Sequence, residues 1–266
     1  MTNSAITSVL AALALLPALF ASLKSRDRAD GIYRAAVFLA IVGPAYWLIS
    51  AGTHGWTRDL AGALWASVAA TIVVYAVVAL MTRAGWRLGV IVFPYVSIIA
   101  AIAALRASTA DTGPVLGGGP AGWLVVHAVT SVLTYAVATV GAIAAAAGYV
   151  QQRALKDKSP TSLSRRLPSL ADCDALQIRL LGLCALVLGF GLLSGTATSL
   201  AREGVWFSLD HKTILGALAF IVISVLLVAN RRGDVRARQI GRAALSAYLL
   251  LTLAYVGVKV VTDVML

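Results

Sequence analysis

Long apolar stretches alternate with short polar gaps along the whole chain. A helix crosses the hydrocarbon layer of a membrane, which is about 30 Å thick, with roughly 20 mostly apolar residues. Eight stretches approach or exceed that length, and we place the predicted spans at residues 5–23, 32–52, 60–81, 87–105, 122–150, 175–198, 212–229 and 242–263. The pattern therefore predicts an all-α, polytopic integral membrane protein with eight transmembrane helices. Pro17, Pro44 and Pro94 fall inside spans, where the missing backbone amide favours a kink.

Positive charge predicts the orientation of these spans. Most of the 22 Lys and Arg residues lie in every second gap, after the first, third, fifth and seventh spans. Because Lys and Arg resist export across a membrane, we assign these gaps to the cytoplasm. Both chain termini are then expected outside, in the periplasm of a bacterium with this protein in its inner membrane, and an even number of spans agrees.

The gaps are too short to hold a soluble domain, so we expect one transmembrane domain over residues 1–266. The gap at 106–121 is rich in Gly and Pro, which is typical of irregular backbone. It separates an N-terminal half of four spans, 1–105, from a C-terminal half of four spans, 122–266. The longest inner gap lies near residues 151–174.

Composition narrows the class of protein further. With 60% apolar and 12% charged residues, the chain is unlike a soluble domain, in which about a quarter of the residues are charged. The net charge of +11 follows the cytoplasmic gaps, so it indicates contact with anionic lipid headgroups and not with nucleic acid. Cys173 and Cys184 are too far apart on one helix to form a disulfide, and we expect both to be packing residues.

Small residues are frequent in the spans at 122–150 and 175–198. Gly141 and Gly148 fall in the first of these spans, and Gly182, Gly189, Gly191 and Gly195 fall in the second. Small residues allow helix backbones to approach closely in lipid. Two interpretations remain open, which are tight helix packing and space for a flat ligand between the helices.

Ionisable side chains inside a membrane are costly and often mark a functional site. His127 lies about one turn inside the outer end of its span, and His211, Lys212 and Lys259 are predicted at a similar depth on the same face. Asp210 precedes His211, where its carboxylate suits a helix N-cap. Trp123 and Trp206 suit an interfacial aromatic belt, and His54 suits an interfacial anchor.

Two candidate sites use these residues. In one, His127 binds a haem iron together with Lys259 or His211, since imidazole is a good iron ligand. In the other, Asp210, Lys212 and Lys259 form a charge relay that moves protons or ions. The sequence pattern alone favours neither.

Three segments of the C-terminal half resemble a known family. They are Trp123-Leu-Val-Val-His127-Ala-Val-Thr-Ser-Val-Leu-Thr-Tyr135, then Leu188-Gly-Phe-Gly191-Leu-Leu-Ser194-Gly195, then Trp206-Phe-Ser-Leu-Asp210-His211-Lys212-Thr213. In this order they resemble the cytochrome c assembly proteins of the CcsA and CcmC type, membrane proteins that handle haem at the outer face for attachment to apocytochromes. The first four spans match only in being spans.

The resemblance implies a set of site residues, with departures from the family pattern. His127 matches the first of two outer haem-ligating histidines, whereas Lys259 stands where the second is expected. The loop that is rich in tryptophan in the family is short here and keeps Trp206. The chain is therefore similar to the small, reduced YpjD- and HemX-like branch, and the activity of a full cytochrome c synthase is not implied.

The leading hypothesis is a non-catalytic, haem-handling accessory of cytochrome c or haem-protein assembly. His127 is expected as an axial ligand with Lys259 or His211 opposite, and Asp210, Lys212 and Trp206 are expected to line the site near haem propionates or an assembly partner. The alternatives are an accessory scaffold subunit of a larger inner-membrane complex without a cofactor, and an ion or small-solute transporter or its accessory.

Overall fold

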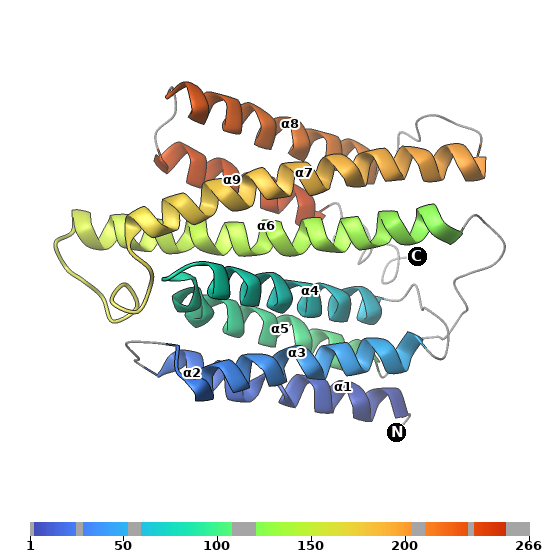
Figure 1. Cartoon of the computed structure of the whole chain (residues 1–266), viewed down its shortest axis with the longest axis horizontal. Coiled ribbons are helices and arrows are strands. Elements are labelled where there is room, and N and C mark those ends of the chain that lie inside the picture. Colours follow the sequence, from blue (N-terminus) through green and yellow to red (C-terminus); the bar gives the residue numbers. More distant parts are fainter. Residues whose placement is uncertain are drawn as a thin grey trace. The chain divides into compact units, whose positions relative to one another are not determined.

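A computed structural model describes residues 3–24, 29–52, 60–107, 121–203, 211–233 and 237–253. All regular structure in these ranges is helical (Figure 1). The helices are α1 (Asn3–Leu13), α2 (Leu16–Leu23), α3 (Gly31–Gly52), α4 (Leu60–Met81), the 3-10 helix η1 (Gly85–Leu88), α5 (Gly89–Ala107), α6 (Ala121–Lys156), α7 (Leu170–Glu203), α8 (His211–Arg232) and α9 (Ala237–Thr252).

The prediction of a polytopic, all-α membrane protein is confirmed. Seven segments of the described chain are long and apolar enough to cross a membrane, and they correspond to the first seven predicted spans. The eighth predicted span, 242–263, begins inside α9, and the described residues end at 253. Large apolar side chains are exposed along the helices, as expected where lipid surrounds a protein.

The first predicted span is divided into two helices, α1 and α2. Leu15 N donates a hydrogen bond to the carbonyl of Ala12, three residues back, so the helix tightens before α2 begins. Pro17 follows in the first turn of α2, where a residue without a backbone amide is tolerated. The predicted span over 5–23 is confirmed as one apolar segment, Ala5–Leu23, and the turn near Pro17 divides it into two helices.

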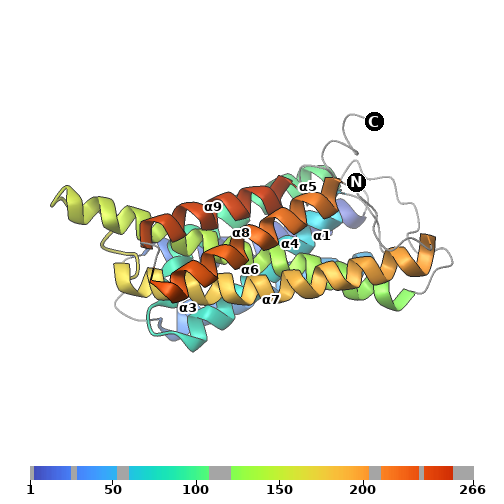
Figure 2. The same cartoon turned by 90° about the horizontal axis from the view of Figure 1, so that it is seen from above.

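The helices of the predicted fifth and sixth spans are longer than expected. With 36 residues, α6 is about 54 Å long at 1.5 Å per residue, well beyond the roughly 30 Å of hydrocarbon. Its last turns carry Gln151, Gln152 and Arg153, and Figure 2 shows this end standing clear of the neighbouring α7 and α9. The apolar residues predicted only the part of the helix expected to lie in lipid, and the polar turns beyond it continue the same helix.

Contacts divide the chain into two compact units. Unit 1 comprises Met1–Gly117 together with Arg166–Pro168, and unit 2 comprises Gly118–Arg165 and Ser169–Leu266. In unit 1, α4 is the most buried helix and packs against α3 and α5. In unit 2, α6 and α7 form the most extensive helix pair, and α9 packs against α6 and α8.

Aromatic side chains fill the core of unit 1. Trp47 and Trp65 stack with ring centroids 5.7 Å apart, and the Trp65 indole donates a hydrogen bond of 3.0 Å to Ser8 Oγ. Further along the unit, the hydroxyls of Tyr33 and Tyr75 lie against one another and both donate to the carbonyl of Trp86. These contacts fix the η1 turn to α3 and α4.

Candidate functional site

His127 lies in the second turn of α6, at the end of the helix that the charge pattern assigns to the outer face. Its side chain is partly buried against α7. The imidazole Nδ1 is 3.0 Å from the carbonyl oxygen of Gly191 and 3.4 Å from Ser194 Oγ. The structure therefore brings together two of the three segments on which the family resemblance rests.

The carbonyl of Gly191 decides which nitrogen of His127 carries the hydrogen in the neutral ring. A carbonyl oxygen only accepts hydrogen bonds, so Nδ1 must be the donor across this 3.0 Å contact. Nε2 then keeps a free lone pair, and within the described part of the chain no hydrogen-bond partner meets it. An imidazole with one nitrogen bonded to backbone and the other available has the form that metal-ligating histidines adopt.

Hydroxyl groups surround the base of the His127 side chain. Ser131 Oγ donates to the carbonyl of His127 at 2.7 Å, and Thr130 Oγ1 donates to the carbonyl of Val126 at 2.8 Å. Ser194 Oγ lies 3.5 Å from Thr130 Oγ1. These hydroxyls are satisfied locally, as membrane helices require. They provide polarity at the α6–α7 contact but no iron ligand.

The outward surface of α6 around His127 is apolar. Trp123 is one turn before His127 on the same side of the helix, and half of its surface is exposed. Val126 and Val129 are exposed as well. On the side of α6 that carries His127, the exposed apolar surface is that of Trp123, whereas Val126 and Val129 lie on other faces of the helix.

The other predicted site residues are not placed by the structure. Trp206, Asp210 and Lys259 lie outside the described residues, as does His54. His211 and Lys212 form the first turn of α8 by backbone, and their side chains lie outside the described part. The predicted grouping of these residues with His127 stays a prediction.

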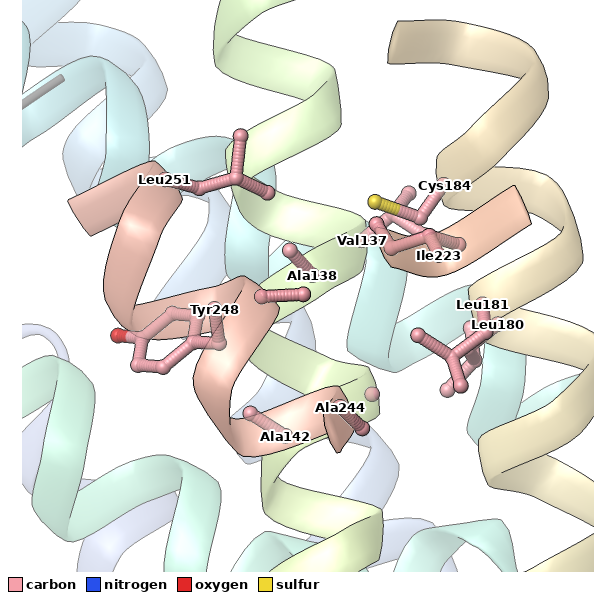
Figure 3. Close-up of a pocket in the computed structure, with 12 residues that line it drawn as sticks. Val137, Ala138, Ala142, Leu180, Leu181, Cys184, Ile223, Ala244, Tyr248 and Leu251 are labelled. Atoms are coloured by element: carbon pink, nitrogen blue, oxygen red, sulfur yellow. The ribbon is translucent and has the colours of Figure 1, made fainter. Parts of the chain in front are cut away.

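Small residues along α6 and α7 serve close packing. A Cβ added at Gly148 would lie 3.4 Å from the Cβ of Cys173, and one at Gly141 would lie 3.5 Å from the Cβ of Leu180. Deeper in unit 2, an apolar cavity of about 10 Å³ lies between α6, α7, α8 and α9 (Figure 3). That volume suits about one water molecule, so this cavity has no room for a flat cofactor.

The described cysteines and carboxylates do not form a metal site. Cys173 and Cys184 are both buried on α7. Within the described ranges, no group of three or more His, Cys, Asp or Glu side chains is arranged to hold a metal ion. An iron bound at His127 would therefore take its other ligands from a porphyrin or from residues outside the described ranges.

Sequence reasoning identified His127 but did not predict its partners. Gly191 and Gly195 entered as small residues suited to helix packing or to a flat ligand, and Ser194 entered as part of a motif, but none was predicted to contact His127. The available signal was their spacing, since positions i, i+3 and i+4 share one face of a helix. What the pattern lacked was the register of α7 against α6.

Comparison with known proteins agrees with the resemblance. The model of the family described as "Cytochrome C assembly protein" matches residues 30–266, so the similarity also includes the second, third and fourth predicted spans, which the motifs did not cover. An Azospirillum brasilense protein, described as an uncharacterized 28.8 kDa protein in the nifR3-like 5' region, is 40% identical over 271 residues and covers all of both chains. No solved structure matches. The chain belongs to the cytochrome c assembly protein family.

Proposed function

We propose that this protein is a haem-handling accessory of cytochrome c or haem-protein assembly, and that it binds haem through Nε2 of His127 near the outer face of the membrane. The observation that carries the proposal is the His127 imidazole, which is bonded to Gly191 through Nδ1 and has no hydrogen-bond partner at Nε2 among the residues that the structure describes. Membership of the family supports a role in haem handling during cytochrome c biogenesis.

The chemistry of the residues around His127 fits haem better than a bare metal ion. A porphyrin supplies four nitrogen ligands, so haem iron needs only one or two ligands from the protein. Trp123, one turn before His127 on the same side of α6, offers exposed aromatic surface to the macrocycle. When bound, haem would supply an iron centre that the chain presents to a partner, and the residues of this chain would bind and orient it.

Residues beyond the described ranges would complete the site. Lys259 or His211 is our proposed ligand opposite His127. A lysine ligates iron only after losing its proton, whereas its ammonium form pairs directly with a carboxylate. We therefore favour His211 at the iron and Lys259 or Lys212 at the haem propionates, with Asp210 and Trp206 at the edge of the site.

The role is proposed to be that of a carrier or accessory and not of an enzyme. Acidic side chains in the described ranges lie beside or at the ends of helices, including Asp30, Asp157, Asp172, Asp174 and Glu203. A transport path normally requires polar groups near the middle of the membrane. The described arrangement thus favours binding at one face over conduction through the bundle.

Haem titration of the detergent-purified protein tests the proposal. Haem quenches tryptophan fluorescence, so the decrease gives a Kd for wild type, His127→Ala and the control His54→Ala. We expect His127→Ala to weaken binding at least tenfold and His54→Ala to leave the Kd unchanged. Equal affinity of all three proteins would contradict the assignment of His127, and absence of binding in wild type would favour a scaffold role.

A further inference from the structure

We infer that α7 holds His127 in one orientation and one tautomer through a socket formed by Gly191, Ser194 and Gly195, which makes these three positioning residues of the site. The use of the socket for haem rests on the proposed function, whereas its geometry does not. The three residues share one face of α7 and together meet the imidazole from α6.

Both polar partners of Nδ1 are hydrogen-bond acceptors. Ser194 Oγ donates its single hydrogen to the carbonyl of Gly191 across 3.0 Å. Its oxygen therefore presents lone pairs to Nδ1 at 3.4 Å, as the Gly191 carbonyl does at 3.0 Å. With two acceptors in front of it, Nδ1 carries the hydrogen in the neutral ring, and Nε2 is then the nitrogen with the lone pair.

Gly195 provides the space that this arrangement needs. A Cβ at position 195 would lie 3.1 Å from Cε1 of His127 and 3.3 Å from Nδ1. Such contacts are tighter than nine in ten real Cβ contacts, so the ring would have to shift by a few tenths of an ångström. The absence of a side chain at Gly195 lets the imidazole lie directly against α7.

The socket has a consequence for ligand binding. Backbone carbonyls that bond the second nitrogen of a ligating histidine fix its tautomer and orientation, and loss of such a partner typically weakens metal affinity by about 10- to 100-fold. We expect losses in this range for Gly195→Ala, which displaces the ring. Ser194→Ala removes the weaker acceptor and leaves Gly191, so its loss is expected near the lower end.

The tautomer can be measured without haem. Histidine labelled with ¹⁵N is introduced into a His54→Gln/His211→Gln background, so that His127 is the only histidine, and the ring nitrogens are observed by NMR in mildly alkaline buffer. We expect a protonated Nδ1 and an unprotonated Nε2 in this parent protein. Gly195→Ala should shift signal intensity toward the Nε2-protonated form, and Ser194→Ala should do so to a smaller extent.

Matched variants separate positioning from general packing. Gly182 is also on α7, and a Cβ there would meet nothing within 4 Å, so Gly182→Ala should leave the tautomer and the haem Kd unchanged. Ser194→Thr retains the hydroxyl and should restore the parent spectrum relative to Ser194→Ala. Because Ser194→Ala only removes an atom, it keeps the test open if Gly195→Ala fails to fold.

The outcomes distinguish the socket from the proposed function. A parent spectrum with Nε2 protonated, or a Gly195→Ala spectrum identical to that of the parent, would overturn the socket whatever the haem affinity. If the expected tautomer is observed but the wild-type protein binds no haem, the socket is supported and the proposed function is contradicted. The expected tautomer together with a 10- to 100-fold loss in Gly195→Ala supports both.

Discussion

At a contact between two membrane helices, the imidazole of His127 has one nitrogen bonded to backbone and, among the described residues, no partner at the other. A polar group in lipid is costly unless it is hydrogen-bonded, and here the carbonyl of Gly191 satisfies one side of the ring. The remaining nitrogen is then the reactive feature. At this scale the sequence identified His127 as a candidate, because an ionisable side chain inside an apolar stretch stands out, and its depth in the membrane stays a prediction.

The buried indole of Trp65 should depend on Ser8. Both side chains are fully buried, and Ser8 Oγ accepts the indole hydrogen at 3.0 Å. Ser8→Ala leaves that donor without a partner, so we expect a loss of about 1 kcal/mol in the free energy of unfolding. A double-mutant cycle with Trp65→Phe, measured by denaturant titration in detergent, should show coupling of similar size. Strictly additive losses would argue against the bond.

Gly89 should tolerate no side chain, because two tyrosines occupy the space beside it. A Cβ there would lie 2.6 Å from the hydroxyl oxygen of Tyr75 and would also collide with that of Tyr33. Gly89→Ala should therefore cost about 1–3 kcal/mol of stability. Thermal unfolding can compare it with Gly31→Ala, where a Cβ meets nothing within 4 Å. Equal melting temperatures of the two variants would contradict this packing.

At the level of elements, the length of each apolar stretch predicted that a helix is present. The polar residues that flank each stretch were a poor guide to where the helix ends. The turn between α1 and α2 and the polar last turns of α6 both illustrate this limit. Apolarity reports the environment of a residue, whereas helix continuity depends on local backbone bonds. The sequence also left open whether small residues served packing or a ligand. The close α6–α7 approach favours packing.

The α6–α7 contact yields a graded prediction. Gly148 is buried with Cys173 in contact range, so Gly148→Ala should cost less than about 1 kcal/mol, whereas Gly148→Leu should cost about 1–3 kcal/mol through overpacking. Gly182→Leu is the control, because Gly182 is on α7 and a Cβ there would meet nothing within 4 Å. Unfolding in detergent should separate Gly148→Leu from this control. A similar loss of stability in both variants would mean that leucine destabilises the helix pair wherever it is placed, and would contradict tight packing at Gly148.

For the whole molecule, the sequence predicted the membrane class, and the family match covers more of the chain than the motifs did. Motif comparison depends on chemically distinctive residues, and the N-terminal spans contain few. The orientation across the membrane rests on charge alone. It remains a prediction with a direct test.

Thiol labelling of intact cells tests the orientation. The native Cys173 and Cys184 are buried and should stay unlabelled by a membrane-impermeant reagent. Exposed Ala201 lies near the end of α7 assigned to the outside, and exposed Ser159 lies in the gap assigned to the cytoplasm. Ala201→Cys should be labelled in intact cells, and Ser159→Cys only after the membrane is permeabilised. The reverse result would invert the topology and place His127 at the inner face.

The most direct test of the central claim is a reduced-minus-oxidised absorption spectrum of the purified protein, recorded for wild type and for His127→Ala. The account predicts a Soret band at near-stoichiometric intensity in wild type, after addition of haem if necessary, and its loss in the variant. A band that is unchanged in His127→Ala, or no band in wild type even with added haem, would contradict a haem site at His127.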